Sequence, residues 1–170
     1  IDALLAKGAD PNSRTRFGKS ALMFAVEEGH EEVAFRLIAK GANVNAKSVA
    51  GCSALTFAAE GGHDNLVDRL LKQGASTQNK TRAGWDALMI ATRYNHLDVI
   101  DTLLQHGANM NTSDKDGITA LMAAADKGYY DAVVHLLKAG ADTFVQNSEG
   151  ATALMMAAKN GRIPVVGLLM

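Results

Sequence analysis

The sequence predicts an all-α solenoid, in which short helix-turn-helix units stack in a row and hairpin-like loops project between them. Two series of residues with one shared period predict this fold. The first is a turn glycine every 33 residues, always followed three residues later by Ala-Leu: Gly18, Gly51, Gly84, Gly117 and Gly150. The second is a Gly-Ala pair every 33 residues, beginning at Gly8, Gly41, Gly74, Gly107 and Gly140. Aromatic residues make up only 5% of the chain, which suits close helix packing better than a β-sandwich or barrel.

The first helix of each unit is predicted from its two ends. Two residues after each turn glycine stands a residue whose side-chain oxygen can accept a hydrogen bond from a free amide N–H of the first helical turn. These N-cap residues are Ser20, Ser53, Asp86, Thr119 and Thr152. The helix then places its leucine and the alanine three residues later on one face. Residues that tolerate a left-handed backbone are expected to end it: Gly29, Gly62, Asn95, Gly128 and Gly161.

The second helix of each unit carries a single apolar stripe and ends at the Gly-Ala pair. Pairs such as Leu37-Ile38 and Leu103-Leu104 form this stripe. Isolated helices shorter than ~12–15 residues are marginal in water, so each unit is expected to bury its stripe only against its neighbours.

The organisation expected is one domain over residues 1–170. It comprises a partial repeat (1–17), repeats near 18–50, 51–83, 84–116 and 117–149, and a truncated repeat (150–170). The chain begins inside a second helix (Ile1, Leu4, Leu5) and stops inside another, so we expect a longer array or further flanking residues. Pro164 and Gly167 fall in the last helix, and a mid-helix glycine predicts a weaker final unit.

The stretch GKSALMFAVEEGHEEVAFRLIAKGANVN, from Gly18 to Asn45, resembles the ankyrin repeat. The resemblance rests on the turn glycine, the leucine, the Gly-His step, the apolar stripe and the closing GANVN, and it extends over the whole chain. It implies an ankyrin-repeat solenoid. The family's proline after the N-cap is alanine in every unit here, and the family's histidine is replaced by Met23, Thr56, Met89, Met122 and Met155. A soft binding stripe is one interpretation of the methionines, but we expect them to pack in the core.

Composition excludes several classes of function. A formal charge of −1 predicts no general attraction to nucleic acid or to a membrane surface. No apolar run reaches the ~18 residues of a membrane span, and no signal peptide is visible. The single cysteine, Cys52, rules out an internal disulfide framework and favours a reducing, intracellular and cytoplasmic location.

No catalytic, cofactor or metal site is expected, and we predict that the chain is not an enzyme. Cys52 has no histidine at neighbouring loop positions, so it is interpreted as an ordinary thiol rather than a nucleophile. His30, His63 and His96 recur at one repeat position, but equivalent positions in stacked helices lie ~8–10 Å apart, too far for shared zinc. We expect these histidines to help begin the second helices.

Three asparagines allow two interpretations. Asn12, Asn45 and Asn111 resemble the asparagines that an intracellular hydroxylase modifies in animal ankyrin repeats, and each has a leucine eight residues upstream. The favoured interpretation is that each asparagine satisfies backbone groups of its turn.

The resemblance implies that a partner protein or peptide lies on the concave face of the loops and first helices. Trp85, Tyr94, Arg82 and Arg93 are of the types enriched at interface hot spots, and they converge on one unit. Trp85 follows its turn glycine where other units carry lysine, cysteine, isoleucine or alanine, so we expect an exposed loop tip rather than a core position. The candidate partner-binding residues are Arg14, Arg16, Phe17, Lys19, Lys47, Val49, Lys80, Arg82, Trp85, Arg93, Tyr94, Lys115 and Ile118.

Charge along the loops favours a partner with an acidic segment. Residues 13–19, 46–52 and 79–85 carry +3, +1 and +2, whereas residues 112–118 and 145–151 carry −1 each. An acidic segment would be steered over the first three loops. We therefore predict a monomeric protein-binding scaffold, with at most weak end-to-end self-association. The alternatives are a regulatory or targeting segment of a larger enzyme, channel or pathogen effector, and a structural spacer.

Overall fold

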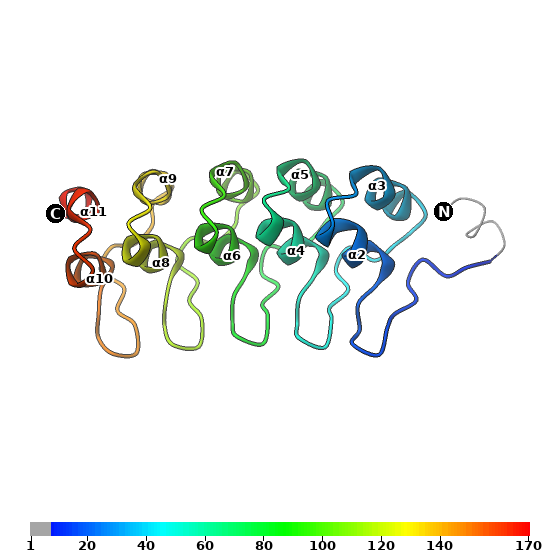
Figure 1. Cartoon of the computed structure of the whole chain (residues 1–170), viewed down its shortest axis with the longest axis horizontal. Helices are drawn as coiled ribbons and strands as arrows, with labels where there is room; N and C mark the ends of the chain where they lie inside the picture. The colour runs from blue at the N-terminus through cyan, green and yellow to red at the C-terminus, as the bar shows by residue number, and fades with distance from the viewer. Residues whose placement is uncertain (1–7) are drawn as a thin grey trace.

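The computed structural model of the chain describes residues 8–170 and confirms the all-α solenoid. Figure 1 shows two layers of short helices with the loops projecting beyond the inner layer. The inner helices are α2 (Ala21–Glu27), α4 (Ala54–Gly61), α6 (Ala87–Arg93), α8 (Ala120–Lys127) and α10 (Ala153–Lys159). The outer helices are α3 (Glu31–Ala39), α5 (Asp64–Lys72), α7 (Leu97–Gln105), α9 (Tyr130–Lys138) and α11 (Ile163–Leu169). The helix predicted around Ile1, Leu4 and Leu5 lies outside the described residues.

The predicted ends of the inner helices are confirmed. Each N-cap side chain accepts a hydrogen bond from the amide three residues later, as in the 2.9 Å bond from the Met89 amide to Asp86. At the other end, Asn95 adopts a left-handed backbone with φ of 58°, in the place where the other units have glycine. The sequence therefore fixes where each inner helix starts and stops.

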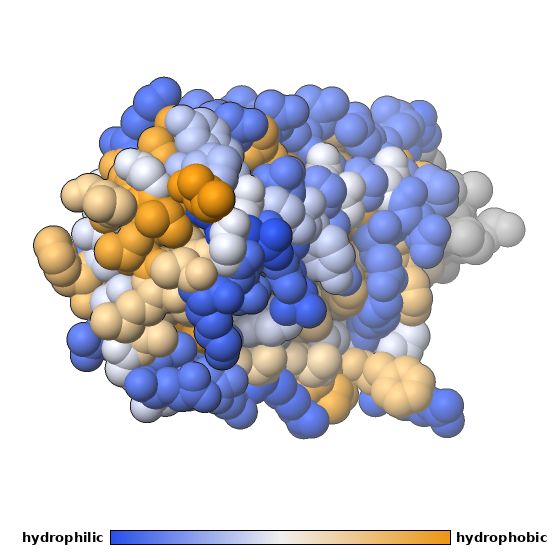
Figure 2. Space-filling view, turned by 60° about the vertical axis from the view of Figure 1, so that its left-hand side comes forward, coloured by the Kyte–Doolittle hydropathy of each residue, from blue (hydrophilic) through white to orange (hydrophobic). Residues whose placement is uncertain are grey.

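Three of the inner-helix methionines are buried, as predicted for the core. Met23, Met89 and Met122 are 1%, 5% and 1% exposed, because each is covered by the next unit. The prediction is wrong for Met155, which is 56% exposed. Among residues 8–170 no further unit covers α10 and α11, and Figure 2 shows apolar surface gathered at this end of the stack.

Each loop is a short hairpin closed by one recurring residue, three positions before the turn glycine. In the first loop the Thr15 amide donates to the Lys19 carbonyl at 2.9 Å, and the Thr15 hydroxyl accepts from the Lys19 amide at 3.2 Å. The same pair of bonds recurs at four further loop positions: Ser48, Thr81, Asp114 and Asn147. The loops thus have a fixed shape before any partner arrives.

Asn12, Asn45 and Asn111 bond to backbone groups, as the favoured interpretation expects, but these groups belong to the next unit rather than to the asparagine's own turn. Asn45 Nδ2 donates to the Gly74 carbonyl at 2.8 Å, and Asn45 Oδ1 accepts from the Ser76 amide at 2.8 Å. Asn12 makes the matching bonds one unit earlier, and Asn111 accepts from the Asp142 amide.

The burial of the methionines predicts unequal effects for one substitution at two equivalent positions. Met122→Ala leaves a cavity in the core and is expected to lower the free energy of unfolding by about 2–5 kcal/mol. Met155→Ala removes the same atoms from an exposed site and should cost under about 1 kcal/mol. Urea unfolding followed by circular dichroism measures both, and equal costs would contradict the burial argument.

Candidate functional site

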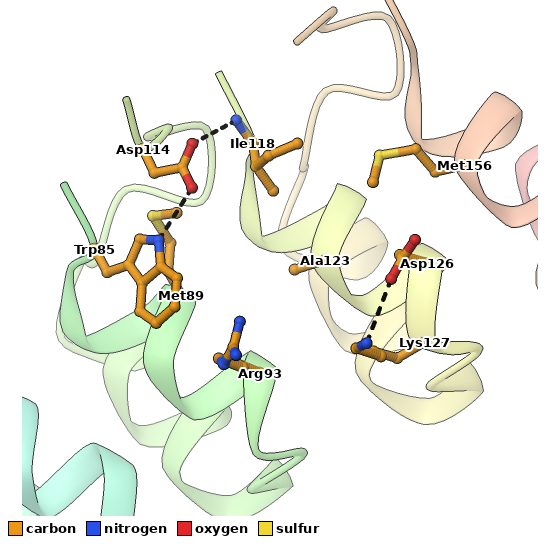
Figure 3. A pocket seen from close by; sticks show the side chains of 9 residues that line it. All are labelled: Trp85, Met89, Arg93, Asp114, Ile118, Ala123, Asp126, Lys127 and Met156. Carbon is orange, nitrogen blue, oxygen red and sulfur yellow. Dashed lines mark hydrogen bonds and ion pairs between the residues drawn. The ribbon is translucent and has the colours of Figure 1, made fainter. Parts of the chain in front are cut away.

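Trp85 lies between two hollows on the face formed by the loops and inner helices. One hollow, between the third and fourth units, has a volume of about 240 Å³ and is called here the Ala123 pocket (Figure 3). The other, between the second and third units, has a volume of about 310 Å³ and is called the Cys52 pocket. Trp85 lines both pockets, so one side chain joins two neighbouring recesses of the predicted binding face.

The Ala123 pocket exists because one unit has a small residue where others have large ones. Ala123 occupies the repeat position held elsewhere by Phe24, Phe57, Ile90 and Met156. The missing side chain leaves a space with mostly apolar walls. These walls are Trp85, Met89, Ile118, Ala123 and Met156.

Charged groups surround the mouth of the Ala123 pocket, and most have partners within the chain. The Asp126 carboxylate lies 3.6 Å from the Lys127 ammonium and accepts from Asn160 Nδ2 at 2.8 Å. The Arg93 guanidinium lies over the Trp85 ring, 4.6 Å from its centroid. In the part of the chain that the structure describes, no carboxylate lies within ion-pair distance of Arg93.

The expectation that Trp85 is exposed is only partly right, because the side chain is half-buried. Its indole Nε1 donates to Asp114 Oδ2 in the next loop at 3.0 Å, while Arg93 covers one face of the ring (Figure 3). The ring is therefore outside the core, as predicted, but held against its neighbours rather than extended into solvent. A fixed ring loses little conformational entropy when a partner packs on it.

Asp114 is the residue that fixes Trp85, and the sequence analysis did not identify it. Its carboxylate also accepts from the amides of Asp116 and Ile118, both at 2.9 Å. Other units have threonine, serine or asparagine at this position. A comparison of each repeat position across the units would have revealed both Asp114 and Ala123 as departures.

The junction between the third and fourth loops is held by side chains. Other neighbouring loops share a backbone bond, such as that from the Arg82 amide to the Ala50 carbonyl at 2.8 Å. Among the described residues no such bond joins Lys115 to Ala83, and Gln78 replaces the linking asparagine without making a side-chain bond. The Trp85–Asp114 bond and a 2.7 Å bond from Lys80 Nζ to the Ser113 carbonyl cross this junction.

The Cys52 pocket brings together Arg82, Trp85 and Tyr94, as the repeat register predicts. The Tyr94 hydroxyl donates to Glu60 Oε1 at 3.0 Å, and its ring stacks on His96 with centroids 6.1 Å apart. The hydrogen bond to the Glu60 carboxylate raises the pKa of Tyr94 above its ordinary value of 10.0. Cys52 is half-buried in the wall of the pocket.

Several predicted contact residues lie outside both pockets. Phe17 and Val49 are exposed on adjacent loop tips, and Arg16 lies over the Phe17 ring at 4.6 Å. Lys47 and Lys115 are exposed on their loops. Arg14 donates to the Lys47 carbonyl in the next loop, a bond that leaves the positive charge of Arg14 intact.

Lys19 is not a free cation. Its ammonium pairs with Glu27 and lies over the rings of Phe24 and Phe57, at 5.0 and 4.6 Å. The positive charge that the sequence analysis assigned to the first loop is therefore partly neutralised from the adjoining helix, whose residues were not counted with the loop. The carboxylate responsible lies eight residues further along the chain.

The repeated histidines lie at the starts of the outer helices. His30, His63 and His96 are the N-cap residues of α3, α5 and α7, and His96 Nε2 lies 2.9 Å from the Glu60 carbonyl. Within residues 8–170 no group of three or more His, Cys, Asp or Glu side chains is arranged to hold a metal ion. No helix in the same range is both long and apolar enough to cross a bilayer.

The stacked helix pairs, the hydrogen-bonded loops and the recessed inner face define a repeat solenoid. The sequence matches the family described as ankyrin repeats (3 copies), over residues 1–81, 37–114, 65–147 and 88–170. These ranges cover the whole chain, which therefore belongs to the ankyrin repeat family. Repeats of this family are generally protein–protein interaction modules and typically non-catalytic scaffolds. A search among curated proteins found no match.

The three bonds to Asp114 predict that Asp114→Ala frees the Trp85 ring. We expect stronger quenching of the Trp85 fluorescence by acrylamide and an unfolding free energy lower by about 1–3 kcal/mol. The emission reports this residue alone, since the chain has one tryptophan.

Asp116→Ala is the matched control, because it removes an equal charge two residues away. The Asp116 side chain makes no hydrogen bond within the described residues, so this variant should leave quenching and stability nearly unchanged. Equal quenching in both variants would show that Asp114 does not hold the ring.

The bond between Tyr94 and Glu60 predicts a shifted titration. Ionisation of Tyr94 removes the donated proton and leaves a phenolate facing a carboxylate, so it requires a higher pH than usual. Glu60→Gln should lower the Tyr94 pKa toward its ordinary value. Phenolate absorbance, taken as the difference from the same protein with Tyr94→Phe, measures this pKa. Glu28→Gln is the control. An unchanged Tyr94 pKa in the Glu60→Gln variant would refute the assignment.

Proposed function

We propose that the chain binds a partner protein or peptide on the face formed by its loops and inner helices, with Trp85 at the centre. The observation that carries this proposal is that Trp85 forms a wall of both pockets. Its ring is held by Asp114 and Arg93, so a partner would meet a preformed aromatic surface. Aromatic residues and arginine are also the types that dominate binding energy at interfaces.

The partner segment is proposed to be acidic. Arg82 and Arg93 are exposed beside the two pockets, and neither has an ion-pair partner in the described part of the chain. Arg14 and Lys80 donate to backbone carbonyls, which does not cancel their charge. Although Lys19 is paired with Glu27, the first three loops keep a positive excess, whereas the fourth and fifth carry −1 each. An acidic segment is therefore attracted toward the first three loops.

Binding is proposed to take place inside the cell, without catalysis by this chain. Cys52 is a free thiol, and a single free cysteine is typical of a reducing compartment.

The proposal predicts how peptides selected on this protein from a random-sequence library bind to its variants. Trp85→Ala should weaken binding of the selected peptides by about 30-fold or more, as expected when a hot-spot aromatic is truncated. Tyr130→Ala removes an exposed aromatic side chain from the outer helix α9 and should leave affinity unchanged. Fluorescence polarisation measures the affinities, and circular dichroism checks that both variants stay helical.

The salt dependence of the affinity tests independently whether charge contributes to binding. The affinity of the selected peptides should fall as ionic strength rises, because screening weakens the attraction between their carboxylates and the basic loops. Peptides that bind Trp85→Ala as well as wild type, with no salt dependence, would place the binding site elsewhere.

A further inference from the structure

The Ala123 pocket lies where other units have a large side chain and the fourth unit has only a methyl group. At the junction of the first two units, Phe57 fills the equivalent position, and the Lys19 ammonium closes over its ring. In the fourth unit Ala123 contributes only a methyl group, and the recess stays open between α6, α8 and α10 (Figure 3). The scaffold therefore accepts a phenylalanine at this position in one unit and leaves it vacant in another.

The size of the pocket indicates what can enter it. Sites for drug-sized ligands and cofactors are clefts of ≈ 300–1,000 Å³. The Ala123 pocket holds about 240 Å³, below that range, and it is open to solvent on the loop–helix face. Two of its apolar walls are the flexible side chains of Met89 and Met156, which can adjust to the shape of an inserted group. One apolar side chain of a polypeptide suits such a recess better than a whole small molecule.

The charges at the pocket mouth indicate what lies beside that side chain. Asp126 is paired with Lys127, and Asp114 is occupied by the Trp85 indole and two amides. Arg93 is thus the charge at this mouth that has no opposite charge within ion-pair distance in the described residues. A carboxylate next to the inserted side chain would pair with Arg93.

We infer that the Ala123 pocket receives one apolar side chain, of leucine to phenylalanine size, from an extended partner segment, and that a neighbouring carboxylate of this segment pairs with Arg93. This inference rests on the proposed function, and it identifies the partner segment by an apolar anchor with an adjacent acidic residue. The anchor packs against the indole of Trp85 and against Ile118, and the acidic neighbour lies toward the basic side of the face.

The experiment uses the peptides selected from a random-sequence library on the wild-type protein as probes. Each apolar residue of a probe is replaced by alanine in turn, and each acidic residue by its amide. We expect one apolar replacement to weaken binding by about 10- to 100-fold, the effect of losing a buried side chain. Ala123→Phe fills the pocket, so the same replacement should have almost no effect on that variant, whose affinity for the unaltered probe is already reduced. A double-mutant cycle measures this coupling.

Two controls separate a filled pocket from a damaged fold. Ala39→Phe makes the same change at an exposed position of the outer helix α3 and should bind like wild type. Ala123→Met fills less of the pocket than Ala123→Phe does and matches Met156 in the next unit. This variant should lose an intermediate amount of affinity for the probe. Arg93→Gln should abolish the effect of one acidic replacement only.

The outcomes distinguish this inference from the proposed function. Probes that need Trp85 but bind wild type and Ala123→Phe equally would overturn the pocket inference and leave the proposed function standing. Probes that bind independently of Trp85, or a library that yields no binder, would overturn both.

Discussion

No helix in the described part of this protein is long enough to be stable alone. The longest helices have nine residues, such as Glu31–Ala39, and helices shorter than ~12–15 residues are marginal in water. Each helix therefore depends on burial against its neighbours, and the inner helices meet through a repeated alanine. Ala25, Ala58, Ala91 and Ala124 are at most 4% exposed, and their small side chains let successive helices approach closely. The repeat period, the caps and the glycine turns all serve this stacking.

Stacking constrains some positions in every unit and leaves others free to vary. The buried leucine, the alanine and the N-cap recur because each junction needs them. The residue after the turn glycine and the inner-helix position of Ala123 are not constant between units, and they range from lysine to tryptophan and from alanine to phenylalanine. Trp85 and Ala123 occupy these free positions, and together they make one recess. The surface specific to this protein thus arises where the repeats differ.

The sequence was sufficient for features that depend on one unit and its nearest neighbour. The caps at Asp86 and Asn95 and the burial of Met122 followed from local spacing and from the expected stack. The partners of Trp85 and Lys19 did not follow, because they depend on side-chain conformations and on residues of another element. Asp114 is 29 residues from Trp85, and no helical or turn spacing relates the two. The pocket at Ala123 was readable from the repeat register, but only by asking which side chain is missing rather than which is present.

The junction between the third and fourth units has a consequence for cooperativity. Where other neighbouring loops share a backbone bond, this junction is crossed by side-chain bonds of Trp85 and Lys80, and Trp85 also lines both pockets. A ligand seated there would touch α6, α8 and α10 together and act as a clasp across three units. Ligand binding and stacking of these units are then thermodynamically linked. A ligand that binds only when the units are stacked raises the free energy needed to separate the third unit from the fourth. Occupancy of the site would therefore raise the stability of the three units that the ligand joins.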